Sequence, residues 1–159
     1  MASTITAATM TVTISESITL NGKNQGGTTT KSISSIAEIT KRILTITTAE
    51  AVIATFSAAV ASAGHYLAAN VRYIRFTNLD DTNFVTLTFR NQDNDEAAIK
   101  IDAGQSFIFN GDNANGLTAV LNATQDADAA SSTNFGSLTN IQADADTGSC
   151  DLEMVIASV

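Results

Sequence analysis

The stretch VRYIRFTNLDDTNFVTLTFR, residues 71–90, decides the fold class. Apolar and polar side chains alternate in both of its halves, and a period of two is typical of β-strands that bury one face. The polar residues 79–83 between the halves predict a turn. Arg72 is expected to point outward. The residues expected to face the core are Ile74, Phe76, Val85, Leu87 and Phe89.

Further alternating segments follow toward the C-terminus. Residues 97–101 and 105–109 predict two more strands joined by short turns, so that the four strands would form an antiparallel meander. A short strand is expected at 117–121. The segments 138–143 and 149–157 predict a closing hairpin.

The N-terminal side adds a long strand, because Met10–Leu20 alternates over its whole length and ends in an Asn-Gly turn signal. Glu16 interrupts the apolar face. A bend in the strand is favoured over a buried acid with a basic partner, since unpaired charge is rarely buried. Residues 1–9 are small and polar, and we expect them to form a mobile arm that can add a strand to a neighbouring subunit.

The segment 35–44 is open to two interpretations. Ser35 and Glu38 match a capping box, and the isoleucines from Ile36 onward have near-helical spacing, which together predict a one-turn helix at 35–39. The β-branched residues that dominate 39–47 predict a strand instead. We expect the strand, with the helical turn as the alternative.

These segments together predict an all-β protein. About eight to ten short strands with turn signals between them favour an antiparallel, jelly-roll-like β-sandwich. The chain has 159 residues, which suits one domain. We therefore expect a single sandwich domain at 10–159 behind the arm at 1–9.

Composition excludes several classes of protein. Eight basic against sixteen acidic residues give a net charge of -8, which is the opposite of a phosphate-binding surface and argues against a nucleic-acid partner. No apolar run approaches the about 20 residues of a membrane helix, and the first residues lack the features of a signal peptide. We expect no membrane partner, and synthesis in a cytoplasm.

Few residues are candidates for chemistry. Cys150 alternates with apolar residues and is expected to be a buried, inert thiol, and the single histidine, His65, lies in no recognisable motif. We predict no enzyme and no cofactor. The acidic loop residues are expected to keep the surface solvated, and the weak alternative is a Ca²⁺ site. Its candidate ligands are Asp80, Asp81, Asp93 and Asp95.

Two aromatic residues, Tyr73 and Phe84, fall on the outward faces of neighbouring strands. A second layer of the sandwich or a subunit interface would explain them equally well. With the generous apolar content, they predict a homotrimer or another closed oligomer.

Several segments, taken in order, resemble small virion structural proteins of tailed bacteriophages. They are TVTISESITLNG (11–22), KRILT (41–45), IATF (53–56), VRYIRFTNLD (71–80), AGQS (103–106) and DLEMVIAS (151–158). The resemblance implies a small β-sandwich or jelly roll, often trimeric, that is attached to the capsid shell or to a tail. It implies no catalytic residues.

The functional expectation follows from that resemblance. It is a capsid decoration or cement protein, assembled in the host cytoplasm into the virion, that binds the major capsid protein and stabilises the shell. One alternative is a phage tail or receptor-facing component that binds host carbohydrate. Another is a stand-alone carbohydrate-binding module or a hydrolase.

Overall fold

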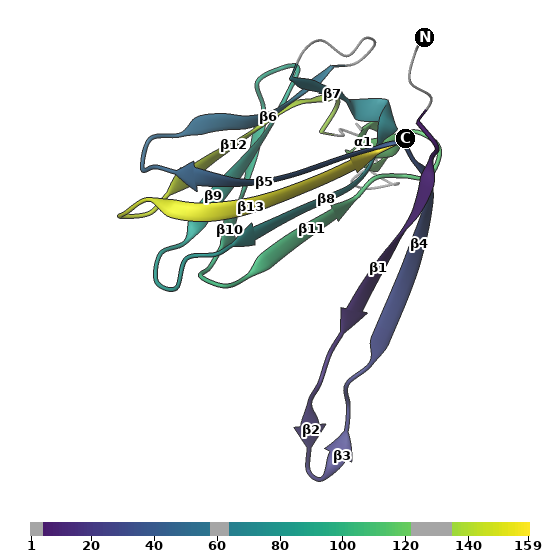
Figure 1. Cartoon of the computed structure of the whole chain (residues 1–159). Coiled ribbons are helices and arrows are strands. Elements are labelled where there is room, and N and C mark those ends of the chain that lie inside the picture. The colour runs from purple at the N-terminus through teal and green to yellow at the C-terminus, as the bar shows by residue number, and fades with distance from the viewer. Residues whose placement is uncertain (1–4, 58–63, 122–134) are drawn as a thin grey trace, which may run out of the picture.

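The computed structural model describes residues 5–57, 64–121 and 135–159. Two antiparallel sheets pack face to face as a β-sandwich, and a long hairpin extends away from it (Figure 1). The first sheet has the order β10 (Glu96–Ile101), β9 (Val85–Asn91), β12 (Leu138–Ala145), β6 (Ala51–Ser57) and β7 (His65–Leu67). The second has the order β11 (Ser106–Asn110), β8 (Val71–Asn78), β13 (Cys150–Ser158) and β5 (Glu38–Ile46). The predicted all-β sandwich is confirmed.

The strand connections define a jelly roll. Without the short β7, which pairs parallel to β6, each sheet has four antiparallel strands, in the orders β5-β13-β8-β11 and β6-β12-β9-β10. The chain crosses from one sheet to the other at every connection from β5 to β13 except those between β6 and β7 and between β9 and β10. This is the two-sheet, eight-stranded arrangement in which Greek-key connections wrap around one core.

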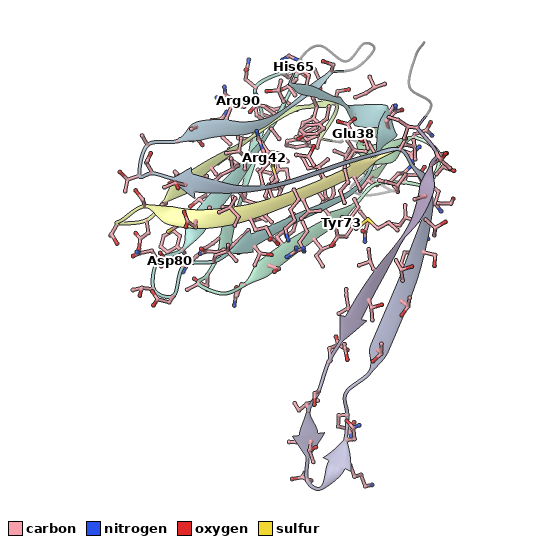
Figure 2. All side chains as sticks on the ribbon, viewed as in Figure 1. Glu38, Arg42, His65, Tyr73, Asp80 and Arg90 are labelled. Carbon is pink, nitrogen blue, oxygen red and sulfur yellow. The ribbon has the colours of Figure 1, made fainter. Side chains whose placement is uncertain are left out.

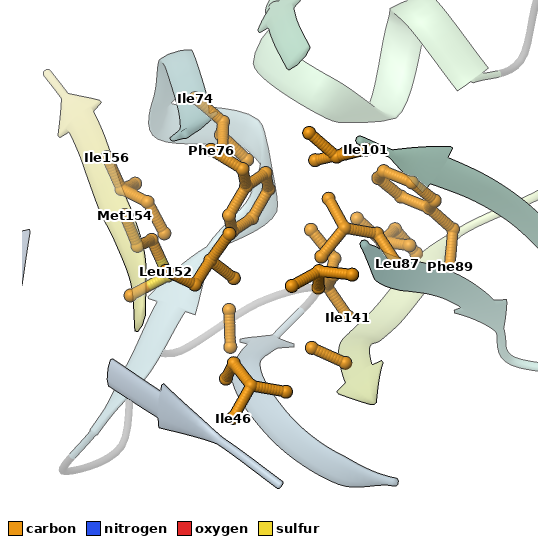
Figure 3. Packing of buried hydrophobic residues seen from close by; sticks show 14 of the residues in the cluster. Ile46, Ile74, Phe76, Leu87, Phe89, Ile101, Ile141, Leu152, Met154 and Ile156 are labelled. Atoms are coloured by element: carbon orange, nitrogen blue, oxygen red, sulfur yellow. The ribbon is translucent and has the colours of Figure 1, made fainter. Parts of the chain in front are cut away.

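The core lies between the two sheets. The inward faces of β8 and β13 meet those of β9 and β12 (Figure 3). All five residues that were expected to face the core are buried there, namely Ile74, Phe76, Val85, Leu87 and Phe89. Phe76, Leu87 and Leu152 are fully enclosed. Each such side chain contributes about 1.5–3 kcal/mol by leaving water. The aromatic rings of Phe89, Phe107 and Phe109 close one edge of the core through edge and stacked contacts.

Three predicted pairings were wrong, namely β8 with β9, β10 with β11, and β12 with β13. β8 and β9 lie in different sheets, so the four central strands form no meander, and only β9 with β10 and β8 with β11 pair directly. β12 and β13 also lie in different sheets, and the predicted closing hairpin is a crossover. Alternation shows which side of a strand is buried. Strands of both sheets in a sandwich bury one side, so the alternating pattern does not show which sheet a strand belongs to.

The ambiguous segment at 35–44 is extended. β4 (Thr28–Ile36) and β5 follow each other with only Ala37 between them, and no helical turn forms there. Ser35 has a φ of 62° at a bulge in β4, which turns both Ile33 and Ile36 to the same side. The near-helical spacing does not place the isoleucines on one face, because Ile39 and Ile43 of β5 are exposed whereas Ile46 is buried in the core.

Two short helices flank the start of β8. The 3₁₀-helix η1 (Ala68–Asn70) precedes it, and α1 (Gly116–Leu121) replaces the short strand expected at 117–121. Gly116 has a φ of 58°, and a Cβ there would lie 2.5 Å from the carbonyl oxygen of Ala68. Arg72, expected to point outward, is 9% exposed, because its guanidinium donates to the carbonyl of Ala69 at 2.6 Å.

The hairpin outside the sandwich consists of β1 (Ala8–Ser15) and β4, with β2 (Thr19–Leu20) and β3 (Lys23–Asn24) at its end. Asn21 and Gly22 both have positive φ, which forms the expected tight turn. We call residues 8–36 the arm. Within the expected arm at 1–9, residues 1–4 lie outside the described residues, Ile5–Ala7 form no strand, and Ala8 already pairs with Ile36.

Candidate interaction surface

The base of the arm packs on the outer face of the four-stranded sheet. Ile33 and Ile36 of β4 are buried there against Tyr73, Val155 and Ala157. Met10 and Val12 of β1 are partly buried in the same cluster. Tyr73 therefore points outward from its strand, as expected, but the chain's own arm leaves it only 4% exposed (Figure 2). Burial raises the pKa of its hydroxyl, and the neighbouring Arg75 partly offsets this.

Beyond the base, the arm leaves the sandwich and its apolar side chains are exposed. Ile14, Ile18 and Leu20 are 47%, 55% and 59% exposed, and we call these three residues the arm row. The other side of the ribbon is hydroxyl-rich, with Thr13 opposite Thr30 and Ser15 opposite Thr28. The sequence pattern that predicted a core strand thus continues on a ribbon that has no core beneath it.

Glu16 marks the point where β1 ends. Its side chain is exposed, and its backbone N–H donates to the carbonyl of Gly27 at 2.8 Å. A Cβ at Gly26 would lie 2.2 Å from the carbonyl oxygen of Glu16. The two sides of the hairpin therefore approach too closely there for any residue other than glycine. The interpretation of Glu16 as a break in the strand is confirmed.

Charge is distributed unevenly between the arm and the rest of the chain. The arm contains Lys23 and Lys31 against one acid, Glu16, and therefore carries a net charge of +1. Since the whole chain carries -8, the remainder carries -9. A positively charged ribbon thus extends from an acidic body.

The outer face of the four-stranded sheet continues past the arm base to β5, which is an edge strand. Ile39 and Ile43 point outward there and are 62% and 60% exposed, and we call this pair the β5 patch. Lys41 lies between them along the strand, and its Nζ lies 2.9 Å from a carboxylate oxygen of Glu153, which also pairs with Arg75. These partners, Lys41 first, lower the pKa of Glu153.

Phe84, the second interface candidate, lies in the connection from β8 to β9 and is half-buried. The ammonium of Lys100 lies 4.4 Å from the centre of its ring, which is a cation–π contact. Phe84 does not belong to the cluster around Tyr73. The two candidates are therefore not brought together.

The acidic candidates for Ca²⁺ lie in two turns at opposite ends of β9. Asp80 accepts hydrogen bonds from the backbone N–H of Asn83 and Thr82, which lower its pKa. Asp93 and Asp95 each accept from the side-chain amide of a neighbouring residue. Within residues 5–57, 64–121 and 135–159, no three His, Cys, Asp or Glu side chains gather as metal ligands. Asp81 accepts from the Thr82 hydroxyl.

Cys150 and His65 lie apart in the two sheets. Cys150 is fully buried at the start of β13, and burial raises the pKa of its thiol, with Asp80, Asp146 and Asp151 adding to the effect. His65 is exposed in β7, where its Nδ1 lies 3.1 Å from the Ser57 hydroxyl. A raised thiol pKa lowers the population of the nucleophilic thiolate.

Hollows of about 470 and 400 Å³ lie around Arg72, Lys31 and Ile33 at the arm base, and two more open at the edges of the sandwich. One, of about 380 Å³, lies between β5 and β6 and includes Glu38, Arg42, His65 and Tyr66 (Figure 2). The other, of about 170 Å³, is wholly apolar. It is lined by Phe89, Ala97, Ile99, Phe107, Phe109 and Phe135.

Sequence reasoning missed two buried asparagines, Asn78 and Asn91, which are 0% and 3% exposed. Each is the last residue of a strand and precedes an acidic turn, and that position was the only available signal in the sequence. Both hold turns together rather than bind a ligand.

No family model, curated protein or solved structure matches this chain. In the described part of the chain, neither helix has the length and apolar content needed to cross a membrane.

Proposed function

We propose that this chain is a non-enzymatic structural protein of a bacteriophage virion, a decoration protein that binds the major capsid protein and stabilises the shell. The observation that carries the proposal is the arm, whose exposed apolar row on an acidic jelly-roll body is suited to attachment and not to catalysis. A homotrimer on the particle is part of the proposal.

Three further points support this function. The segments quoted above resemble virion structural proteins of tailed phages. Jelly rolls are found in both capsid and lectin domains, so the fold is compatible with a shell role without requiring it. The body's net charge of -9 keeps free subunits apart and complements a basic surface on a shell protein.

Copy number and position in purified virions test the proposal. Quantitative mass spectrometry is expected to find many copies per particle, and imaging is expected to place them over the shell. A few copies confined to the tail would favour the receptor-facing alternative. Absence of the chain from virions would overturn both.

The second candidate function, carbohydrate binding, is favoured by the hollow between β5 and β6. It combines the ring of Tyr66 with the charged groups of Glu38 and Arg42, and sugars are bound by such combinations of an apolar face and hydrogen-bonding groups. Titration of the free protein with a glycan panel tests it. Saturable binding that Tyr66→Ala abolishes would support it, and absence of binding would leave the shell role.

A further inference from the structure

We propose that the arm row of one copy packs on the β5 patch of a second copy, so that subunits are linked arm to sheet. The occupant of the β5 patch is thus another molecule of this chain. This inference concerns the free protein and does not depend on its role in a virion.

The first step is that the outer part of the arm lacks a partner within its own subunit. The outer part of the hairpin extends away from the sandwich (Figure 1). Met10 and Val12 at the arm base are half-buried, while Ile14, Ile18 and Leu20 are exposed. A two-stranded ribbon is marginally stable alone in water. Covering the row would remove three large apolar side chains from water.

The second step is that the partner surface continues an existing contact. Ile33 and Ile36 of the arm already pack on the outer face of the four-stranded sheet, over β8 and β13. Ala157, at the edge of that cluster, pairs directly with Ile39 of β5, so the β5 patch adjoins a contact of the same kind. A second arm would lie beside the first on one sheet face.

The third step is charge. An arm of +1 approaching a body of -9 is attracted to it, whereas two bodies repel each other. On the same sheet face Glu153, in register with Ile43, is already paired with Lys41 and Arg75, so Asp151, in register with Thr45, is the acidic side chain that an arm lysine would approach. Lys23, at the end of the arm, is the cation nearest the turn.

The fourth step is size. The segment from Ile14 to the turn at Asn21 spans about 25 Å, which limits one arm contact to the low end of stable interfaces. Arm-to-sheet contacts are head-to-tail, because each joins two different surfaces. Every arm row and every β5 patch is covered only when the subunits form a closed ring. A closed oligomer, in which each subunit gives one arm and receives one, is therefore expected.

Three double variants test the inference by light scattering. Ile18→Ser/Leu20→Ser removes most of the arm row, and Ile39→Ser/Ile43→Ser removes the β5 patch. Val52→Ser/Leu79→Ser is the matched control, because these residues are 55% and 48% exposed and belong to neither the arm row nor the β5 patch. We expect the wild type and the control to exceed one subunit mass at micromolar concentrations. Each test variant should dissociate at least about tenfold more readily.

A disulfide experiment tests the contact itself. Ile18→Cys protein is mixed with Ile43→Cys protein and oxidised, and Cys150 is buried and does not compete. A covalent dimer that forms in the mixture faster than in either variant alone supports the inference. A monomeric wild type, an oligomer unaffected by both test variants, or absence of the mixed disulfide overturns it. The decoration role is tested separately, by copy number and position in purified virions.

Discussion

At the scale of single residues, Asn78 joins two connections between the sheets. Its side-chain amide donates to the carbonyls of Asn83 at 2.8 Å and Ile101 at 3.2 Å, and its side-chain oxygen accepts from the N–H of Asp80. Its backbone pairs with Gln105 and Gly104. One buried side chain thus holds the connections β8–β9 and β10–β11 side by side.

Asn78→Ala is expected to lower the free energy of unfolding by about 3 kcal/mol. The substitution leaves two carbonyls and one N–H without their partner in a buried place, and each unsatisfied group costs about 1–3 kcal/mol. Urea unfolding measures the effect. The control is Asn113→Ala at an exposed position, which should change stability by less than about 0.5 kcal/mol. A loss for Asn78→Ala no larger than the control's would contradict this role.

Glu153 supplies a pH-dependent contribution. Its folded-state pKa lies below the ordinary value of 4.5, because Lys41 and Arg75 stabilise the carboxylate. The ion pairs therefore stabilise the fold at pH values above 4.5, and that contribution is lost as the pH falls through the lowered pKa.

Glu153→Gln is expected to cost about 1 kcal/mol at pH 7, since Lys41 is largely exposed and its pair is screened by water. Melting temperatures of the variant and the wild type, compared from pH 7 to pH 3, measure the effect. The difference should shrink below pH 4.5. A difference that stayed constant to pH 3 would mean that the carboxylate charge contributes nothing.

At the scale of elements, the arm is held to the sandwich by few side chains. Ile33 and Ile36 enter the cluster around Tyr73 only because the bulge at Ser35 turns both toward the sheet. The remaining strand pairing of the arm is internal to the ribbon. The docking of the arm is therefore separable from the stability of the jelly roll.

Ile33→Ala/Ile36→Ala is expected to release the arm while the sandwich stays folded. Amide hydrogen exchange should speed up in β1 and β4 and remain slow in β8 and β13, because the sandwich core lies on the other side of the sheet. Ile14→Ala, at an exposed position of the same ribbon, is the control. Faster exchange throughout the sandwich would show that the two parts unfold together.

Strand positions could be predicted where alternation was long and bounded by turns. β8, β9 and β13 lie within a residue or two of the predicted segments, as does the Asn21-Gly22 turn. The helix α1 could not be predicted, because Leu117–Leu121 is a short apolar run that suits either structure. The arm could not be recognised either, since Ile14 alternates in the same way whether or not a core lies beneath it.

At the scale of the whole molecule, the sandwich class could be predicted, but the topology could not, and the described residues contain thirteen strands where about eight to ten were expected. Which sheet β9 or β13 joins is decided by pairing between residues far apart in the chain, such as Met154 with Phe76 in one sheet and Ile141 with Phe89 in the other. Tyr73 was placed on the outward face, but nothing local to it in the sequence shows that the arm covers it.

The stability of the molecule is expected not to depend on metal or redox state. The acidic turn residues already accept hydrogen bonds from the backbone or neighbouring amides, and Cys150 is buried. Melting temperature should be unchanged by EDTA and by a reductant, measured separately. A drop of more than a few degrees with EDTA would point to a bound cation, with Asp80, Asp81, Asp93 and Asp95 the first positions to mutate.

The central place of β13 in its sheet determines the order of events during synthesis. β13 lies between β5 and β8, and Thr45 bonds to Asp151, 106 residues later in the chain. Until the ribosome has made residues 150–158, β5 and β8 lack the strand that joins them, whereas the arm can pair locally. The β5 patch is consequently complete only after residues 150–158 have been made and have paired. A nascent chain can therefore form its own arm before its sheet can bind the arm of another copy.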